Sequence, residues 1–495
     1  MAAKYWVPGG TGDTASTTNW SLLSGGVSGA PIPTIADDIF FDSNSGSGTA
    51  TVSVALACLT FTSTGSTNTL NTNFNIAVTV NGNITLGSGF TITGTGFFTV
   101  NAASTIVTNG ATISQFTFGS AGTVTFSDDL HCTNCTFLNS PIINGHNIYI
   151  SGNFVGSSAV PTGTTTFIMN GTGTISGLKL ANPFIINTAG TITFSGINQW
   201  NNNGSSFTYT AGTIVTTGST CTFVSCTVAA GSSCVFNNVV FNNTSNTITT
   251  DIYCNGNFND GAGGFVIAGS FNIYVGGNLQ VSNAGSGAAS FIMNGTGTLS
   301  GRIDNSITIN TSGTITFGSA ISRASGTFKY TAGTVTVGSN TFTAVSGTIT
   351  LDINGITLNN VTCPNNITMT LNSNLAIGGT LALSQSLTFN GTGNATVNTW
   401  TGINTGRVYQ FQAGNTYTFT NSISLTASAG SHSQITSSSG SVKAIVTMTG
   451  GSQSLLYIDG IRIDSSGGAT IKTFGGTLTS TINWTNGLSN FFMFN

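Results

Sequence analysis

Residues 188–193 read Thr-Ala-Gly-Thr-Ile-Thr, and the same stretch returns with one change at 210–215, as Thr-Ala-Gly-Thr-Ile-Val. Two further versions begin at Thr311 and Thr331. A period of about 20 residues, with glycine at a fixed place, predicts a solenoid with one coil per repeat. The residues after the glycine alternate as in a strand, so Ile192 and Phe194 should point inward and Thr191 and Thr193 outward.

A longer duplication contains these repeats. The segment Phe-Ile-Met-Asn-Gly-Thr-Gly-Thr-Ile-Ser-Gly at 167–177 returns at 291–301 with Leu in place of one Ile. The two copies extend over about 147–215 and 272–336. Phe184 corresponds to Ile307, an exchange expected at an inward position. Phe194 and Phe317 should likewise point inward at equivalent places, and Phe194→Ala should cost roughly 3–5 kcal/mol locally.

The composition agrees with such a stack. Only 21 of 495 residues carry a formal charge, and the twelve acids are all Asp. Equivalent residues of successive coils lie about 4.8 Å apart, so like charges in a ladder repel, whereas Thr, Ser and Asn can hydrogen-bond to their own kind. Residues that form solvated helix faces are nearly absent. We therefore expect an all-β chain: a parallel β-helix or β-solenoid with about 20 residues per coil, capped at both ends.

Both ends of the chain differ from the middle in their content of tryptophan and charged residues. Trp6 and Trp20 are two of the five tryptophans, and acids cluster at Asp37, Asp38 and Asp42. Charge becomes more frequent after about residue 400. Because the terminal coils of a solenoid lack a neighbour, they need caps. We expect an amino-terminal cap or attachment module at 1–45, a solenoid at 46–400 and a carboxy-terminal β module or cap at 401–495.

Several partner classes find no support in the sequence. A net charge of -3 gives no basic patch for nucleic acid or anionic lipid. No apolar run has the length of a signal peptide or a membrane span. We therefore expect no nucleic-acid partner, no membrane insertion and no use of the general secretory route. Cys234 and Cys254 lie one repeat apart, which favours stacked reduced core thiols over a disulfide.

Residues able to carry chemistry are scarce. Asp128, Asp129 and His131 lie together, followed by Cys132 and Cys135. The spacing of this group is similar to half of a metal site, but no second Cys/His pair has zinc spacing. We therefore interpret the group as a turn beside core cysteines.

Three further groups have structural interpretations as well. They are Asp459 with Arg462 and Asp464, a solvated or structural pair near the end cap; Arg302 with Asp304, a surface pair; and the Gly-Gly-Thr-Gly-Asp segment at 9–13, which lacks the spacing and tandem copies of a calcium-binding nonapeptide. We predict no catalytic, cofactor-binding or metal-binding residue and no cofactor.

The aromatic carboxy terminus has two open interpretations. Phe491, Phe492, Met493 and Phe494 either seal the last coil or form a docking or oligomer contact. The second interpretation predicts that deleting residues 485–495 lowers the oligomeric mass.

Two stretches carry a resemblance to a known class of proteins. At the amino terminus the residues are Trp6, Gly9-Gly10, Asn19-Trp20-Ser21, Pro33-Thr34, Asp37-Asp38 and Phe41-Asp42. At the carboxy terminus they are 417–420, 435–438, 457–459, 463–464 and Trp484. With these residues the chain resembles β-solenoid structural proteins of tailed, especially marine, bacteriophages. In the general character of its sequence the chain also resembles autotransporter-like passenger domains of bacteria. It lacks their signal peptide and the room for a membrane barrel after the repeats, which favours the phage resemblance.

The resemblance implies a virion structural protein: a fibre, spike or head-decoration element with a stiff neutral surface, located in the virion and released on host lysis. The implied partners are other virion proteins, further copies of the chain with a trimer favoured, and host surface glycans. Two alternatives remain open. A tailspike-like polysaccharide depolymerase requires clustered carboxylates in a groove. A bacterial surface adhesin would be distinguished by the gene's neighbours.

Overall fold

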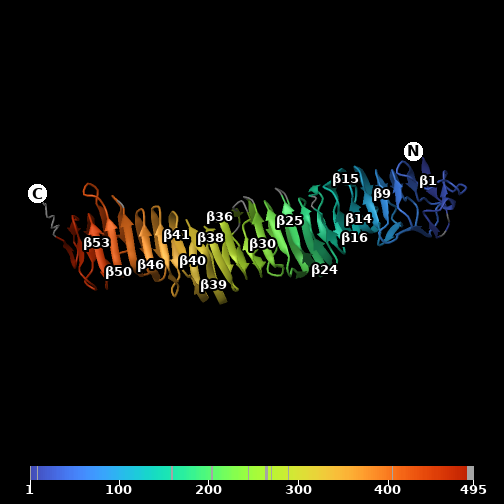
Figure 1. The fold of residues 1–495 in the computed structure, drawn as a ribbon. Coiled ribbons are helices and arrows are strands. Elements are labelled where there is room, and N and C mark those ends of the chain that lie inside the picture. The colour runs from blue at the N-terminus through green and yellow to red at the C-terminus, as the bar shows by residue number, and fades with distance from the viewer. Residues whose placement is uncertain are drawn as a thin grey trace. The chain divides into compact units, whose positions relative to one another are not determined.

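The computed structural model describes the chain apart from residues 1, 8, 10, 158–159, 202–204, 243–244, 262–265, 269, 288, 404 and 488–495. Contacts divide it into two compact units, Met1–Tyr253 and Cys254–Asn495. In Figure 1 the first unit runs from blue to green and the second from green-yellow to red. Each unit is considered by itself below.

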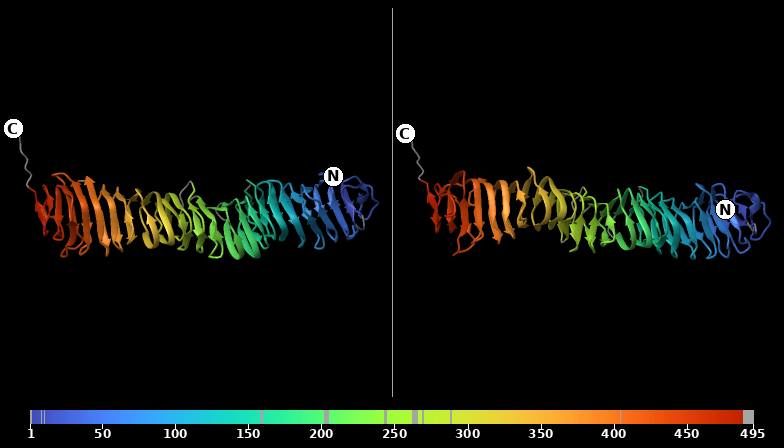
Figure 2. Two further views of the ribbon diagram at one scale, coloured as in Figure 1. Left: turned by 60° about the horizontal axis from the view of Figure 1, so that its bottom comes forward. Right: turned by 90° about the horizontal axis from the view of Figure 1, so that it is seen from below.

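Both units are built from parallel coils. The described chain comprises about 21 coils of about 20 residues each, which confirms the predicted β-solenoid. Within each unit, successive strands lie side by side in all the views of Figures 1 and 2. The described residues include a single 3-10 helix, Thr17–Asn19. They contain no helix that is long and apolar enough to cross a membrane.

One wall of the first unit shows how the sequence period becomes a ladder. Phe61 pairs with Ile84, Ile84 with Ile106, and Ile106 with Phe126, one coil at each step. All four side chains are buried. The strands of this wall are β4 (Asp38–Phe40), β7 (Thr60–Thr62), β10 (Ile84–Thr85), β13 (Ser104–Val107), β15 (Thr123–Phe126), β17 (Ile142–Gly145) and β20 (Thr162–Gly163).

The first unit begins with a cap. Strand β1 (Ala3–Trp6) pairs in parallel with β4 and antiparallel with β3 (Trp20–Ser21). The rings of Trp6 and Trp20 meet edge to face, with centroids 5.3 Å apart, and both residues are fully buried. The antiparallel strand therefore covers the edge that the first coil would otherwise expose.

The duplication forms matching strands in the two units. The first copy contributes β24 (Phe184–Ser195) and β26 (Ser206–Val215); the second contributes β39 (Ile307–Arg323) and β40 (Thr327–Thr336). Phe194 and Phe317 are 1 % and 2 % exposed. Phe184 and Ile307 are also buried, so the predicted register is confirmed at both pairs.

Asparagine side chains join coils at the corners. In the first unit the Oδ1 atom of Asn153 accepts the backbone N–H of Thr174 at 2.9 Å. In the second unit Asn278 does the same for Thr298 at 2.8 Å, and its own N–H donates to Oδ1 of Asn257 at 3.0 Å. A neutral amide thus satisfies a backbone donor of the next coil, as a buried or crowded N–H requires.

Parallel pairing continues across residue 400. Strand β48 (Ala395–Ile403) pairs with β46 (Leu375–Leu383) before it and β50 (Thr416–Thr426) after it. Strand β50 in turn pairs with β52 (Ala444–Met448). The change expected near residue 400 is therefore a change of composition only. The ladder of parallel strands continues without a break past this residue. The last paired strands are β56 (Ile471–Thr473) and β58 (Trp484–Asn486), where Trp484 is 6 % exposed.

One buried residue departs from the predicted pattern. Arg323 corresponds in the duplication to Trp200, and both side chains are fully buried. An Nη atom of Arg323 donates to the carbonyl oxygens of Asn305, Ser325 and Thr327, at 2.8, 3.1 and 3.3 Å. Burial lowers the pKa of this guanidinium to about 10, against the opposite effect of nearby Asp304. The core position thus holds a cation that binds backbone carbonyls through one nitrogen, while its Nε and its other Nη are buried without a hydrogen-bond partner.

Candidate functional site

The group around His131 is divided between core and surface. His131, Cys132 and Cys135 lie on strand β16 (Leu130–Phe137), and both cysteines are buried. Asp128 and Asp129 directly precede this strand, and Asp128 lies in a bend, where the sequence led us to expect a turn. The ring of His131 stacks on Tyr149 of the next coil, with centroids 4.8 Å apart and an interplanar angle of 9°. Burial raises the pKa of the Cys135 thiol well above its ordinary value. A neutral buried thiol is a poor metal ligand.

The two preceding carboxylates accept hydrogen bonds from backbone N–H groups. Asp128 accepts the N–H groups of Thr108, at 2.7 Å, and of Asn109. Asp129 accepts the N–H of Asn147 at 3.0 Å and lies 3.7 Å from Nδ1 of His146. Across the described chain, no group of three or more His, Cys, Asp or Glu residues is placed to hold a metal ion.

The acidic and basic residues near the carboxy terminus are arranged differently from the expected pair. Asp459 lies 2.8 Å from Nδ1 of His432 and also accepts the N–H of Thr477 at 2.7 Å. Asp464 accepts the N–H of Ser466 at 2.9 Å. No ion pair joins Arg462 to either acid in the described part of the chain.

The contact between His432 and Asp459 was not predicted, because the two are far apart in the sequence. A carboxylate that holds an imidazole Nδ1 is also found beside catalytic bases. In the described structure, His432 has no hydrogen bond to a serine or cysteine nucleophile. Its ring lies 5.6 Å from that of Tyr457. The pair therefore joins successive coils.

The other two groups that the sequence analysis singled out also make contacts with neighbouring parts of the chain. Arg302 lies 3.3 Å from Asp304, and the two side chains are 39 % and 10 % exposed. Asp304 accepts the N–H of Ala324 as well, at 2.7 Å. Asp13 accepts the N–H of Ala15 at 2.9 Å and the hydroxyl of Ser53 at 2.7 Å. Both carboxylates thus bridge parts of the chain that are distant in sequence.

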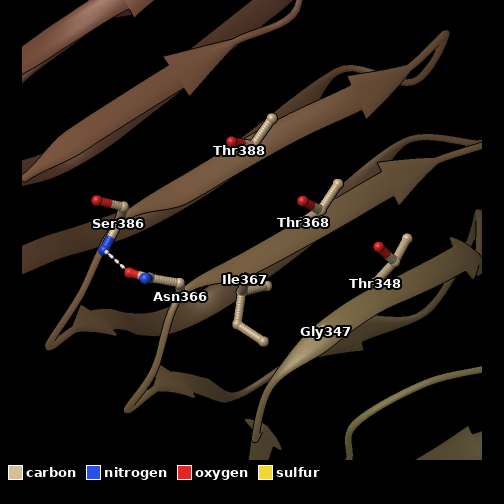
Figure 3. Close-up of a pocket in the computed structure, with 7 residues that line it drawn as sticks. All are labelled: Gly347, Thr348, Asn366, Ile367, Thr368, Ser386 and Thr388. Atoms are coloured by element: carbon tan, nitrogen blue, oxygen red, sulfur yellow. Dashed lines mark hydrogen bonds between the residues drawn. The ribbon is translucent and has the colours of Figure 1, made fainter.

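The second unit carries a shallow neutral groove. Thr348, Thr368 and Thr388 are paired in register on β42 (Gly347–Asp352), β45 (Ile367–Leu371) and β47 (Leu387–Gly391). Figure 3 shows their side chains on one side of three neighbouring strands, with Asn366 and Ser386 at the turns that lead into them.

The volume of this groove is about 260 Å³. Oδ1 of Asn366 accepts the N–H of Ser386 at 3.2 Å. The groove therefore offers hydroxyl and amide groups and no charge.

Phe491, Phe492, Met493 and Phe494 lie outside the described residues, so an oligomer contact there stays a prediction. No protein-family model, curated protein or solved structure matches this chain. The functional interpretation therefore depends on the residues quoted above, the geometry of the coils and the chemistry of their surface.

Proposed function

We propose that this protein is a structural component of a tailed-bacteriophage virion: a fibre, spike or head-decoration element. The observation that carries the proposal is the parallel β-solenoid with a neutral surface of hydroxyl and amide groups. The amino- and carboxy-terminal residues that resemble phage solenoid proteins support it. The proposed location is the virion, with other virion proteins and further copies of the chain as partners.

The physical properties of the coils suit such a role. Within each unit, backbone ladders join successive coils, and side chains such as Asn278 add further bonds at the corners. Because equivalent residues recur in each coil, weak surface contacts can be repeated many times. Repetition multiplies weak attachment without a strong single site. The groove at Thr348, Thr368 and Thr388 offers hydroxyl groups that suit a host glycan.

A tailspike-like depolymerase is the enzymatic alternative. Such an enzyme needs two carboxylates free to act on either side of a glycosidic bond. The roles of Asp128, Asp129, Asp304 and Asp459 as acceptors of backbone N–H groups favour the structural role. Incubating the full chain with capsular polysaccharide of the host distinguishes the two, since a depolymerase releases new reducing ends and a structural protein releases none.

Immuno-electron microscopy tests the proposal directly. Antibodies raised against the full chain are applied to purified particles of the phage whose genome carries the gene. We expect label at one recurrent position on the particle and the chain among the particle's proteins by mass spectrometry. Particles without label or peptide, from cells that contain the protein, would overturn the proposal. A gene set among bacterial surface-export genes would favour the adhesin alternative.

A further inference from the structure

Strand β26 in the first unit continues beyond the coil that follows it. On one side it pairs with β24 as far as Val215. On the other side β28 (Thr227–Ala229) pairs only with Ser206–Thr208. Among the described residues, no strand pairs with 209–215 on that second side. We call residues 210–215 the first open edge.

The second copy has the same arrangement. Strand β40 pairs with β39 as far as Thr336, whereas β42 pairs only with Thr327–Lys329. Residues 331–336 form the second open edge, which lies near the labels β39 and β40 in Figure 1. Since both edges follow from the duplicated sequence, the feature occurs twice by inheritance and is not an accident of one coil.

The next coil does not pair with either open edge, because its chain turns before it reaches that part of the strand. After β28 the chain turns at Gly231, which has a φ of 70°. After β42 it turns at Gly355, which has a φ of 94°. Both values lie in the left-handed region that glycine adopts without strain. Side chains on the edges are accordingly exposed or half-buried, among them Thr210, Thr213, Thr331 and Thr334.

One carbonyl of each edge already has a partner. The hydroxyl of Tyr209 donates to the carbonyl of Gly212, and that of Tyr330 to the carbonyl of Gly333, each at 2.7 Å. Residues 213–215 and 334–336 lie beyond this bond, and no described strand of the next coil pairs with them. An open strand edge of this kind is a template for another strand.

The two edges lack two of the usual protections against such pairing, charge and proline. Exposed edges in soluble proteins are commonly blocked by lysine, by proline or by a covering loop. Neither 210–215 nor 331–336 contains a charged residue or a proline. An incoming strand therefore meets neither charge repulsion nor a missing backbone donor.

We propose that an open edge binds a second copy of this chain, pairing antiparallel with the same edge of the other copy about a twofold axis. The structure already shows which strand such a sequence accepts. On its paired side, Thr213 lies opposite Thr191 and Ile214 opposite Ile192, in a parallel strand of nearly the same sequence. The second copy repeats this with Thr334 opposite Thr314. On the open side a twofold axis requires the added strand to run antiparallel. Two neutral copies do not repel one another, and an edge that pairs with itself about a twofold axis joins two copies. The other edge of each chain then remains available for a further copy.

Sedimentation velocity of the full chain, from about 1 to about 100 μM, tests this contact over the range in which weak association is measurable. We expect reversible self-association of the unmodified chain, beginning with a dimer. The variant with both Thr213→Lys and Thr334→Lys blocks either edge and should weaken dimerisation at least tenfold, because like charges would face each other across the twofold axis. A matched variant with both Thr213→Ser and Thr334→Ser should dimerise as the unmodified chain does.

Further variants separate this contact from others. Thr133→Lys with Thr396→Lys adds the same charge at one exposed position in each unit, away from the edges, and should leave dimerisation unchanged. Circular dichroism checks folding, and if the first lysine pair unfolds the chain, Thr210→Lys with Thr331→Lys replaces it.

Deleting 488–495 tests an aromatic carboxy-terminal contact and should not affect the edge-dependent dimer. A monomer at every concentration, or a dimer that the folded lysine variants do not weaken, would overturn the proposal.

Discussion

At the scale of the residue, large inward side chains account for the packing of each coil. Phe194 lies between Trp200 and Phe207, with ring centroids at 6.1 and 6.4 Å. Phe207 belongs to the following coil, so the ring of Phe194 joins two coils as well as filling one. Because each coil contacts chiefly its neighbours, the loss of such a ring should act locally.

Phe194→Ala should therefore loosen β24 and β26 first. The lost ring and the cavity it leaves should cost roughly 3–5 kcal/mol, whereas Phe194→Leu should cost about 1–2 kcal/mol because it keeps most of the volume. Hydrogen exchange of the amides in these two strands measures the difference. Equal protection in the alanine variant and the unmodified chain would show that the ring contributes little.

Asp37 gives the amino-terminal cap a dependence on pH. Burial acts to raise the pKa of its carboxyl, but hydrogen bonds from the hydroxyl and N–H of Thr34 and from the N–H of Ala2, with nearby Lys4, hold this pKa below its ordinary 3.8. A carboxyl with a lowered folded pKa contributes stability above the unfolded value. That stability is lost as the pH falls through the folded value.

We therefore expect the cap to loosen in acid. Fluorescence of the tryptophans, including Trp6 and Trp20, should change as the pH falls below the ordinary carboxyl pKa of 3.8. In Asp37→Asn, which cannot ionise, this acid step should be missing and the cap less stable at neutral pH. An identical acid transition in both proteins would assign the step to another carboxylate.

At the scale of the element, the corner ladders show why charge is excluded. Asn257 and Asn278 occupy equivalent corners of successive coils and are linked through Oδ1 of the first and the N–H of the second. A carboxylate could accept the same bond, so one Asp is tolerable. Two stacked carboxylates about 4.8 Å apart would repel each other.

A double-mutant cycle measures this repulsion. Asn257→Asp and Asn278→Asp should each change the free energy of unfolding by less than about 1 kcal/mol, since each keeps an acceptor. Together they should lose a further 1–4 kcal/mol, roughly the Coulomb energy of such a pair at a partly solvated site. Additive effects in low salt would contradict this explanation of the composition.

At the scale of the whole molecule, all eight cysteines are buried and free of disulfides. This agrees with the predicted core thiols at Cys234 and Cys254. Burial raises the pKa of Cys363 to about 12. Burial also raises that of Cys226 to about 11, with partial compensation by hydrogen bonds. Few thiolates are then available, and solvent reaches few of the sulfur atoms.

Ellman's reagent at about pH 8 should consequently find almost no reactive thiol in the native protein. After denaturation in guanidinium chloride without reductant, it should find eight, the number in the sequence. A lower count after denaturation would indicate disulfides. Rapid reaction of several thiols in the native protein would show that the coils open readily.

The sequence by itself determined the coil. Repetition at a nearly constant period, alternation of Thr with Ile or Phe, and the scarcity of charge all follow from stacking equivalent residues, so they are readable without coordinates. Only the tertiary structure decided that Arg323 is buried where its counterpart is Trp200, because its partners are backbone carbonyls and carry no sequence signal. It also decided the contact between His432 and Asp459 and the open edges at 210–215 and 331–336. The open edges depend on where the following coil turns, and a slightly earlier turn leaves the sequence period almost unchanged while it removes a strand from the ladder.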